Sequence, residues 1–307
     1  QQSVTSGLYL MLLQKREENA ITLAATANNG RIIEEPMPAG IVSPQGKKIY
    51  MIAFVIGIGI PLGIIFLLNL LRFRIEGHTD VEKLTKVPII GDIPLTGSNK
   101  HEESAIAVRE NDNDIMTETF RSLRTNLLFM MGDPDKKVVL VTSTISGEGK
   151  TFIASNLALS LALLGKKVIL VGLDIRKPGL NKMFHLSHKE KGITQYLAAP
   201  QSTDLHALIQ PSGITSNLDL LLGGPIPPNP TELLARQSLE DTISTLRKEY
   251  DYIVLDTAPI GMVTDTLILS RVADASIYVC RADYTHKTDY QLINELQEHH
   301  RLPNLCT

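Results

Sequence analysis

Cysteine is scarce in this sequence, and clusters of basic residues are missing. Cys280 and Cys306 are the two cysteines among 307 residues, and they fit neither a disulfide framework nor a metal site. This scarcity is typical of a reducing compartment for the second half of the chain. The formal net charge is −3, and no cluster of Lys and Arg forms the basic stripe typical of a nucleic-acid-binding protein. We therefore expect no nucleic-acid partner.

The start of the chain lacks the features of a secretory signal peptide. It begins with Gln1, and no charged region followed by a short apolar region and a cleavage site is present. We expect the sequence to be a fragment whose natural N-terminus lies upstream.

Charge is absent between Ile49 and Leu71, where the sequence reads IYMIAFVIGIGIPLGIIFLLNLL. As a helix this run would be about 35 Å long, enough to cross a hydrocarbon core of about 30 Å. Pro61 and the nearby glycines would destabilise a soluble helix but are common in membrane helices. A buried core helix is the alternative, although such helices rarely stay uncharged over this length. Basic residues flank both ends, so they do not orient the segment.

We divide the chain around this segment into four regions. They are the end of a periplasmic domain over 1–46, a transmembrane helix over 47–74, a cytoplasmic juxtamembrane linker over 75–110 and a globular domain over 111–307. Within the first region, the periodicity predicts a helix over 8–27, followed by an extended, proline-punctuated stretch. Within the linker we expect a short helix at 79–84, a short strand at 87–94 and a polar remainder.

The globular region alternates between helical and strand patterns. Apolar runs with β-branched residues predict buried strands, and a 3.6-residue period predicts helices. The predicted strands are 137–142, 167–171, 218–222, 252–256 and 275–280. The predicted helices are 114–131, 151–164, 231–234, 239–249, 264–271 and 289–299. This alternation predicts an α/β fold with a doubly wound, mostly parallel sheet and helices on both faces.

A glycine-rich loop joins the first predicted strand to the helix that follows it. Residues 143–151 read STISGEGKT, and this strand–loop–helix context is that of a P-loop, hence a P-loop NTPase-type fold. The loop N–H groups suit phosphate oxygens, Lys150 would pair with the β- and γ-phosphates of ATP, and Thr151 would offer its hydroxyl to Mg²⁺. Thr144 departs from the usual pattern, which has Gly there, and a turn without a ligand is the alternative. We predict that the nucleotide is bound by Ser146, Gly147, Glu148, Gly149, Lys150, Thr151 and Phe152.

Two carboxylates are predicted at the same edge of the sheet as this loop. Asp256 ends the strand 252–256, and Asp174 follows the strand 167–171. The carboxyl ends of parallel strands meet at one edge, so both could hold Mg²⁺ together with Thr151, and Asp174 could instead reach the attacking hydroxyl. A purely structural role is the alternative for Asp256. Arg176 is a further candidate, either for a phosphate contact or for capping its turn.

These motifs, in this order, resemble the bacterial tyrosine autokinases (BY-kinases) that are fused to a polysaccharide co-polymerase, or chain-length determinant, region. The resemblance runs from about residue 5 to the end of the chain. STISGEGKT fits the Walker A motif of these kinases, GLDIR their Walker A′ motif, and LDTAP their Walker B motif. Residues 8–46 resemble the end of the periplasmic domain, 49–71 the second membrane helix, and TDVEKLTKVPIIGDIP the juxtamembrane stretch. GGPIPPNPTELL resembles a loop and helix typical of the family.

The resemblance implies a membrane-anchored protein-tyrosine kinase that uses ATP and Mg²⁺. Lys150, Asp174 and Asp256 would be its catalytic residues. Such a kinase phosphorylates neighbouring subunits in the bacterial inner membrane and regulates capsular or exopolysaccharide polymerisation and export. The implied partners are other copies in a ring-like homo-oligomer, the membrane, the polysaccharide machinery and a cognate tyrosine phosphatase. Because ATP is cytosolic, the P-loop places the C-terminal domain in the cytoplasm.

Glu118, Arg121 and Arg124 fit the ExxRxxR motif that packs subunits of the family into a ring. On a helix, Glu118 and Arg121 could merely form an i,i+3 pair worth a few tenths of a kcal/mol. The resemblance favours the subunit contact. The segment from Asn229 to Glu232 is first a helix start, with a possible interface role beside it.

Two departures from the family pattern stand out. Gly172 occupies the position of the first Walker A′ aspartate, so Asp174 is the carboxylate left from that pair. The family's tyrosine-rich C-terminal tail is missing, since Tyr284 and Tyr290 are the last tyrosines and form no cluster. We expect a truncation after Thr307.

Two other classes of function stay open. A partition or positioning ATPase of the MinD/ParA type shares the fold, but its signature lysine would fall on Ile145, which cannot pair with phosphate. Such ATPases also normally lack a membrane-spanning helix. The other alternative is a non-catalytic co-polymerase module that binds ATP to assemble, and Gly172 keeps it open.

Overall fold

The computed structural model describes residues 2–26, 44–70, 73–95, 106–110, 114–186 and 191–307. The chain divides into two compact units, Gln1–Leu68 and Asn69–Thr307. The predicted extended stretch before the membrane segment and most of the polar remainder of the linker lie outside the described residues.

The first unit is helical. Helix α1 covers Gln2–Ala25, in agreement with the helix predicted there, and α2 covers Gly46–Leu70. Within α2, Gly46–Leu67 has a mean hydropathy of 2.5, and it is the one helix among the described residues that is long and apolar enough to cross a membrane. Its apolar side chains are exposed rather than packed in a protein core. The alternative of a buried core helix therefore finds no support.

The second unit is built on a seven-stranded sheet with the order β3-β4-β2-β5-β1-β6-β7. Every neighbouring pair is parallel except β3 and β4. The strands are β1 (Val138–Ser143), β2 (Val168–Gly172), β3 (Ile209–Pro211), β4 (Leu218–Leu221), β5 (Tyr252–Asp256), β6 (Ala275–Val279) and β7 (Leu305–Cys306). The five predicted strands are all present, and the mostly parallel α/β fold is confirmed.

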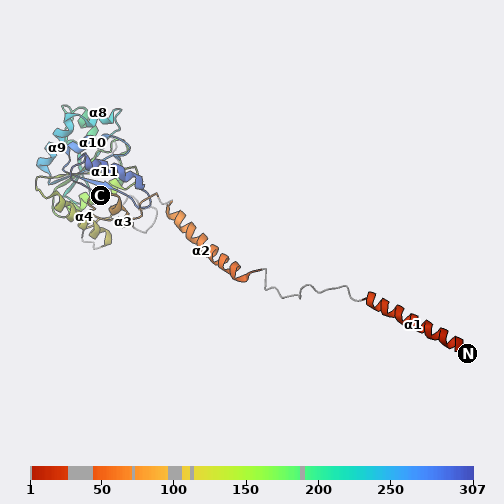
Figure 1. The fold of residues 1–307 in the computed structure, drawn as a ribbon. Coiled ribbons are helices and arrows are strands. Elements are labelled where there is room, and N and C mark those ends of the chain that lie inside the picture. Colours follow the sequence, from red (N-terminus) through yellow and green to blue (C-terminus); the bar gives the residue numbers. More distant parts are fainter. Residues whose placement is uncertain (1, 27–43, 71–72, 96–105, 111–113, 187–190) are drawn as a thin grey trace. The chain divides into compact units, whose positions relative to one another are not determined.

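Both faces of the sheet are covered, because successive side chains of a strand point to opposite faces. In β1, Val139 and Val141 pack in a cluster with α4 and α5, while Val138 and Leu140 pack in a second cluster with α7, α8, α9 and α10. Figure 1 shows α8, α9 and α10 on one side of this unit and α4 on the other. The helices are α4 (Ile115–Met131), α5 (Lys150–Ala162), α6 (Leu180–Met183), α7 (Ile193–Ala198), α8 (Pro230–Leu234), α9 (Gln237–Glu249) and α10 (Asp265–Leu269). Each Leu or Val buried in these clusters contributes about 1.5–3 kcal/mol of transfer free energy.

A third cluster joins the predicted linker to the domain. Helix α3 (His78–Leu84) packs with α11 (Tyr290–Glu298), and Ile75 and Val81 are buried there with Tyr290. The first described part of the linker, residues 75–95, is thus packed on the globular domain.

The strand predicted at 87–94 is wrong. The segment is extended but forms no strand, since its described backbone bonds to the sheet are limited to Ile90 N–H to Thr307 O and Thr307 N–H to Pro88 O. Pro88 and Pro94 lack the N–H groups that a longer ladder would need.

Several short elements have no counterpart in the sequence prediction. They are α6, α7, β3, β7 and two 3₁₀ turns, η1 (His206–Leu208) and η3 (Lys287–Asp289). Most are too short for a periodicity to register. A further 3₁₀ turn, η2 (Ser270–Val272), replaces the last turn of the helix predicted over 264–271.

Asp274 binds the backbone at the start of strand β1. Its carboxylate accepts hydrogen bonds at 2.8 Å from the Lys137 and Val138 N–H groups and at 2.8 Å from Arg247 Nη2. Burial by itself would raise the pKa of Asp274, but these bonds and the charge of Arg247 outweigh it and lower the pKa. A carboxylate with a lowered pKa stabilises the fold above its ordinary pKa, and that stabilisation is lost as the pH falls through the folded-state pKa.

We therefore expect Asp274→Asn to lower the free energy of unfolding by about 1–3 kcal/mol near neutral pH. The difference from wild type should shrink as the pH falls below about 4. Denaturant titration of the two proteins at several pH values measures it, with Asp133→Asn as the exposed control. A difference that stays constant down to pH 3 would contradict the assignment.

Candidate active site

The predicted site residues meet where three neighbouring strands end. The P-loop follows β1, Asp256 is the last residue of β5, and Asp174 lies two residues beyond β2. β5 lies between β1 and β2 in the sheet, with Val141 and Gly172 both in register with Asp256. The backbone N–H of Asp174 also donates to the Asp256 carbonyl at 2.9 Å. The prediction that these residues share one edge of the sheet is thus met by the structure.

The P-loop forms a tight turn between β1 and α5. Gly147 and Gly149 have φ values of 95° and 98°, in the left-handed region that favours glycine. Helix α5 begins at Lys150, so its N-terminus and the N–H groups of the loop face the same space. This is the arrangement that binds phosphate in P-loop proteins.

Lys150 and Asp174 are charged groups held largely out of water. Lys150 is 6% exposed, and burial lowers its pKa, although the charges of Asp256, Asp174 and Glu148 oppose this effect. Burial likewise raises the pKa of Asp174, whose Oδ1 accepts a hydrogen bond from Lys177 N–H at 3.0 Å. The rim therefore carries the Lys150 ammonium close to carboxylates in a medium of low polarity, where charges interact strongly.

Asp256 has a free coordination position. It is 1% exposed; Thr151 Oγ1 donates to its Oδ2 at 2.9 Å, and its Oδ1 has no hydrogen-bond partner among the described residues. Burial raises the pKa of Asp256 to about 7. A carboxylate oxygen without a partner beside a hydroxyl fits a hard cation such as Mg²⁺. The described residues contain no group of three or more His, Cys, Asp or Glu that could hold a metal alone, so such an ion would need phosphate and water ligands as well, which is the usual manner of Mg²⁺.

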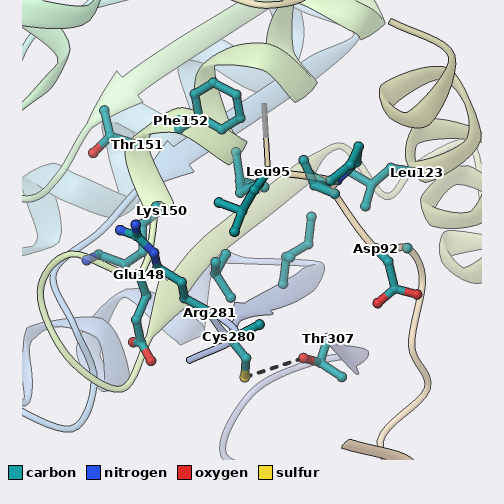
Figure 2. Close-up of a pocket in the computed structure, with 18 of the residues that line it drawn as sticks. Asp92, Leu95, Leu123, Glu148, Lys150, Thr151, Phe152, Cys280, Arg281 and Thr307 are labelled. Carbon is teal, nitrogen blue, oxygen red and sulfur yellow. Dashed lines mark hydrogen bonds between the residues drawn. The ribbon is translucent and has the colours of Figure 1, made fainter. Parts of the chain in front are cut away.

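A cleft of about 1210 Å³ opens beside these residues. Its lining includes the whole run from Ser146 to Phe152 together with Asp174, and Figure 2 shows Lys150 and Thr151 on one side of the cleft with Leu123 and Asp92 on the other. The volume is ample for a nucleotide. Every predicted nucleotide-binding residue except Arg176 lines it.

The contacts of Arg176 differ from both predictions, which were a phosphate contact and a cap of its own turn. Its Nε donates to Asp265 Oδ2 at 2.7 Å and its Nη2 to Thr231 Oγ1 at 2.9 Å, which ties the loop after β2 to α10 and α8. The Asp265 side chain is 1% exposed and that of Arg176 is 38% exposed, so the ion pair is buried on the Asp265 side and reaches solvent on the Arg176 side. A contact between Arg176 and phosphate stays a prediction.

The ExxRxxR motif lies on α4, and its members have different surroundings. Glu118 and Arg121 form an ion pair at the surface. Arg124 instead donates from Nη1 to the Ser160 carbonyl of α5 at 2.6 Å. The i,i+3 pair is therefore present, and a subunit contact through Glu118, Arg121 and Arg124 stays a prediction.

Sequence reasoning missed the turn that follows β6. Arg281, Tyr284 and Thr285 all bond to the P-loop from the side of β1 opposite β5. The signal that could have indicated these three residues is the polar stretch directly after the predicted strand 275–280. The ends of neighbouring parallel strands lie together, so this stretch could be expected near the P-loop.

The comparisons with known proteins agree with this geometry. A family model described as an AAA domain matches residues 136–304. The chain is 29% identical over 294 residues to the tyrosine-protein kinase wzc of Salmonella typhi, and 31% identical over 291 residues to the putative tyrosine-protein kinase EpsB of Ralstonia nicotianae. These alignments cover 91% of this chain but 40% and 38% of the two relatives, so the chain spans about two fifths of their length.

Solved structures of kinase domains resemble the chain as well. The kinase domain of the Escherichia coli tyrosine kinase ETK aligns with a TM-score of 0.65 and 26% identity, covering 74% of this chain and 90% of that one. The BceF tyrosine kinase domain aligns with a TM-score of 0.64 and 26% identity, covering 76% and 96%. The resemblance to bacterial tyrosine kinases drawn from the motifs is thereby confirmed. Since the family model spans more than half of its 307 residues, the chain belongs to the AAA domain family and is a homologue of the bacterial tyrosine kinases.

Proposed function

We propose that this chain is the kinase-bearing part of a membrane-anchored protein-tyrosine kinase that transfers the γ-phosphoryl group of ATP to tyrosines of neighbouring copies. The observation that carries the proposal is the meeting of Lys150, Thr151, Asp174 and Asp256 at one rim, with an Asp256 oxygen left free, in a homologue of tyrosine kinases. Helix α2 would provide the membrane anchor and place the second unit in the cytoplasm.

The proposed role of the site is to position the reactants and balance their charge. Phosphoryl transfer needs little covalent chemistry from the protein. The ammonium of Lys150 would neutralise the β- and γ-phosphates, while Thr151 and Asp256 would hold Mg²⁺, which neutralises developing negative charge when bound. Asp256 is already poised for this role, because a cation would replace the proton that burial favours on its carboxylate.

Asp174 would serve the acceptor tyrosine. As the tyrosine oxygen bonds to the γ-phosphorus, the bond to ADP breaks and the phenolic proton must leave. A carboxylate whose pKa is raised by burial is a better proton acceptor than one in water. Asp174 would therefore take that proton, besides supporting Mg²⁺.

Gly172 makes Asp174 the remaining carboxylate of this segment. A Cβ at position 172 would lie 3.1 Å from the Gly223 nitrogen and 3.1 Å from Leu180 Cδ1. The backbone at Gly223 and the Leu180 side chain thus leave little room for a larger side chain at position 172. The missing carboxylate at position 172 keeps open the second candidate function, an assembly module that binds ATP without kinase output.

The proposed partners follow from the relatives rather than from contacts within the chain. They are other copies in a ring-like homo-oligomer, the capsular or exopolysaccharide polymerisation and export machinery, and a tyrosine phosphatase that reverses the modification. The supporting finding is the similarity to wzc and to a putative tyrosine-protein kinase of the cps region of Klebsiella pneumoniae.

Replacing Lys150 by Met should reduce phosphotyrosine formation by about 100-fold or more, because the phosphates lose their charge partner. Anti-phosphotyrosine detection after incubation with ATP and Mg²⁺ measures it. Lys166→Met, at an exposed position on the same unit, is the matched control. Undiminished phosphorylation in the Lys150→Met protein would show that the site is assigned wrongly.

Replacing Asp174 by Asn should abolish most phosphorylation while ADP binding is largely kept, since the amide cannot accept the tyrosine proton. Phosphotyrosine detection and calorimetric ADP titration separate the two effects. Retained phosphorylation would rule out the role in proton transfer. Loss of ADP binding would instead indicate that Asp174 acts mainly through the nucleotide.

The double replacement Arg121→Ala and Arg124→Ala should give a smaller assembly by light scattering if α4 packs subunits. Because Arg124 also bonds to Ser160 within the chain, Arg121→Ala alone serves as the comparison that leaves this internal bond intact. An unchanged mass in both variants would assign Arg121 to a solvent-facing ion pair.

A further inference from the structure

The turn from Arg281 to Thr285 lies directly behind the P-loop. Strand β6 is paired with β1 on the side away from β5, so the residues that follow β6 leave the sheet next to the loop that follows β1. Figure 2 shows Arg281 beside Glu148 and Lys150. None of the roles assigned above to the phosphate-binding residues involves this turn.

Two side chains of the turn bind carbonyl groups of the loop, and one of them, Arg281, also lines the cleft. Arg281 Nη1 donates to the Gly147 carbonyl at 3.1 Å, and Tyr284 Oη donates to the Ser146 carbonyl at 2.9 Å. When successive N–H groups of a loop converge on an anion, the carbonyls between them face away and need other partners. Arg281 and Tyr284 supply those partners from within the protein.

A third side chain acts through a buried carboxylate. Thr285, fully buried, donates its hydroxyl to Glu148 Oε1, and Glu148 Oε2 accepts the Ile145 N–H at 2.7 Å. Glu148 is 3% exposed, and a buried carboxylate costs free energy unless donors satisfy it. Both of its oxygens are satisfied, one from within the loop and one from the turn, so Thr285 holds Glu148 in the position that shapes residues 145–148.

The turn is itself anchored on its far side. The Arg281 N–H donates to Thr285 Oγ1 at 2.9 Å, which closes the turn. The Ile75 N–H donates to the Thr285 carbonyl at 3.0 Å, and the Asp283 N–H donates to the Ile75 carbonyl at 2.8 Å. The groups that contact the P-loop are therefore carried by a fixed part of the backbone and not by a free loop.

We propose that Arg281, Tyr284 and Thr285 are positioning residues that hold the P-loop in its phosphate-binding shape in the absence of nucleotide, and that Thr285 does so through Glu148. Ordering a loop in advance removes its entropic cost from the binding step, which raises affinity without any new contact to the ligand. The inference rests on the proposed nucleotide site, since it explains how that site is preformed.

Two substitutions at Thr285 separate positioning from packing. Thr285→Val keeps the buried shape but removes the hydroxyl, so Glu148 loses a donor. We expect ATP to bind about 10- to 100-fold more weakly, as for the loss of one hydrogen bond to a charged group. Thr285→Ser keeps the hydroxyl but removes a buried methyl group, so it should lower the melting temperature while ATP affinity stays at the wild-type level. Calorimetric titration of the full chain in detergent with ATP and Mg²⁺ gives the affinities, and thermal unfolding without nucleotide gives the stabilities.

Tyr284→Phe provides a second measurement that does not disturb the core. It removes a partly exposed hydroxyl and should weaken ATP binding by about 2- to 5-fold with little change in melting temperature. Tyr196→Phe, at another partly exposed position and on α7, is the matched control. Equal affinities for the Val and Ser variants of Thr285, or an unchanged affinity in Tyr284→Phe, would overturn the inference. Failure of the wild-type chain to bind ATP would instead contradict the proposed function.

Discussion

The burial of the Asp256 carboxylate is the constraint on which the rest of the site depends. A negative charge at the end of a central strand is costly unless polar groups or a cation meet it. Thr151 satisfies one oxygen and the other is left free, while Lys150 lies near enough for the charge of Asp256 to oppose the effect of burial on its pKa. The protein thus holds opposite charges at one rim, where a magnesium–nucleotide complex would complete the balance.

The parallel register between β1, β5 and β2 makes this arrangement possible. Residues 141, 172 and 256 are aligned across three strands, so the functional groups meet without any long loop to order. The same register brings the turn after β6 to the other side of the P-loop. Neighbouring strand ends therefore supply both the groups proposed to contact the substrate and those proposed to hold the loop in shape.

Much of the fold and the main site residues could be predicted from the sequence, because both depend on local pattern. Apolar runs indicated the five central strands, and the glycine-rich loop with Asp256 and Asp174 followed from strand ends. Partners far apart in the sequence left no such pattern. Nothing near Arg176 indicates that Asp265 would hold it, and the helical spacing of the ExxRxxR motif does not reveal that Arg124 turns inward to Ser160. Elements such as β3, three residues long and antiparallel, depend on a neighbouring strand rather than on their own composition.

The extended segment Pro88–Pro94 also bears on how the sheet avoids unwanted association. Exposed strand edges offer unpaired N–H and C=O groups to other chains and promote aggregation. Next to β7, the N–H and C=O groups of Thr307 are paired with the Pro88 carbonyl and the Ile90 N–H. The prolines of the segment have no N–H group to donate to an incoming strand. A stretch that the sequence predicts as part of a linker would thereby hinder edge-to-edge aggregation at this edge of the sheet.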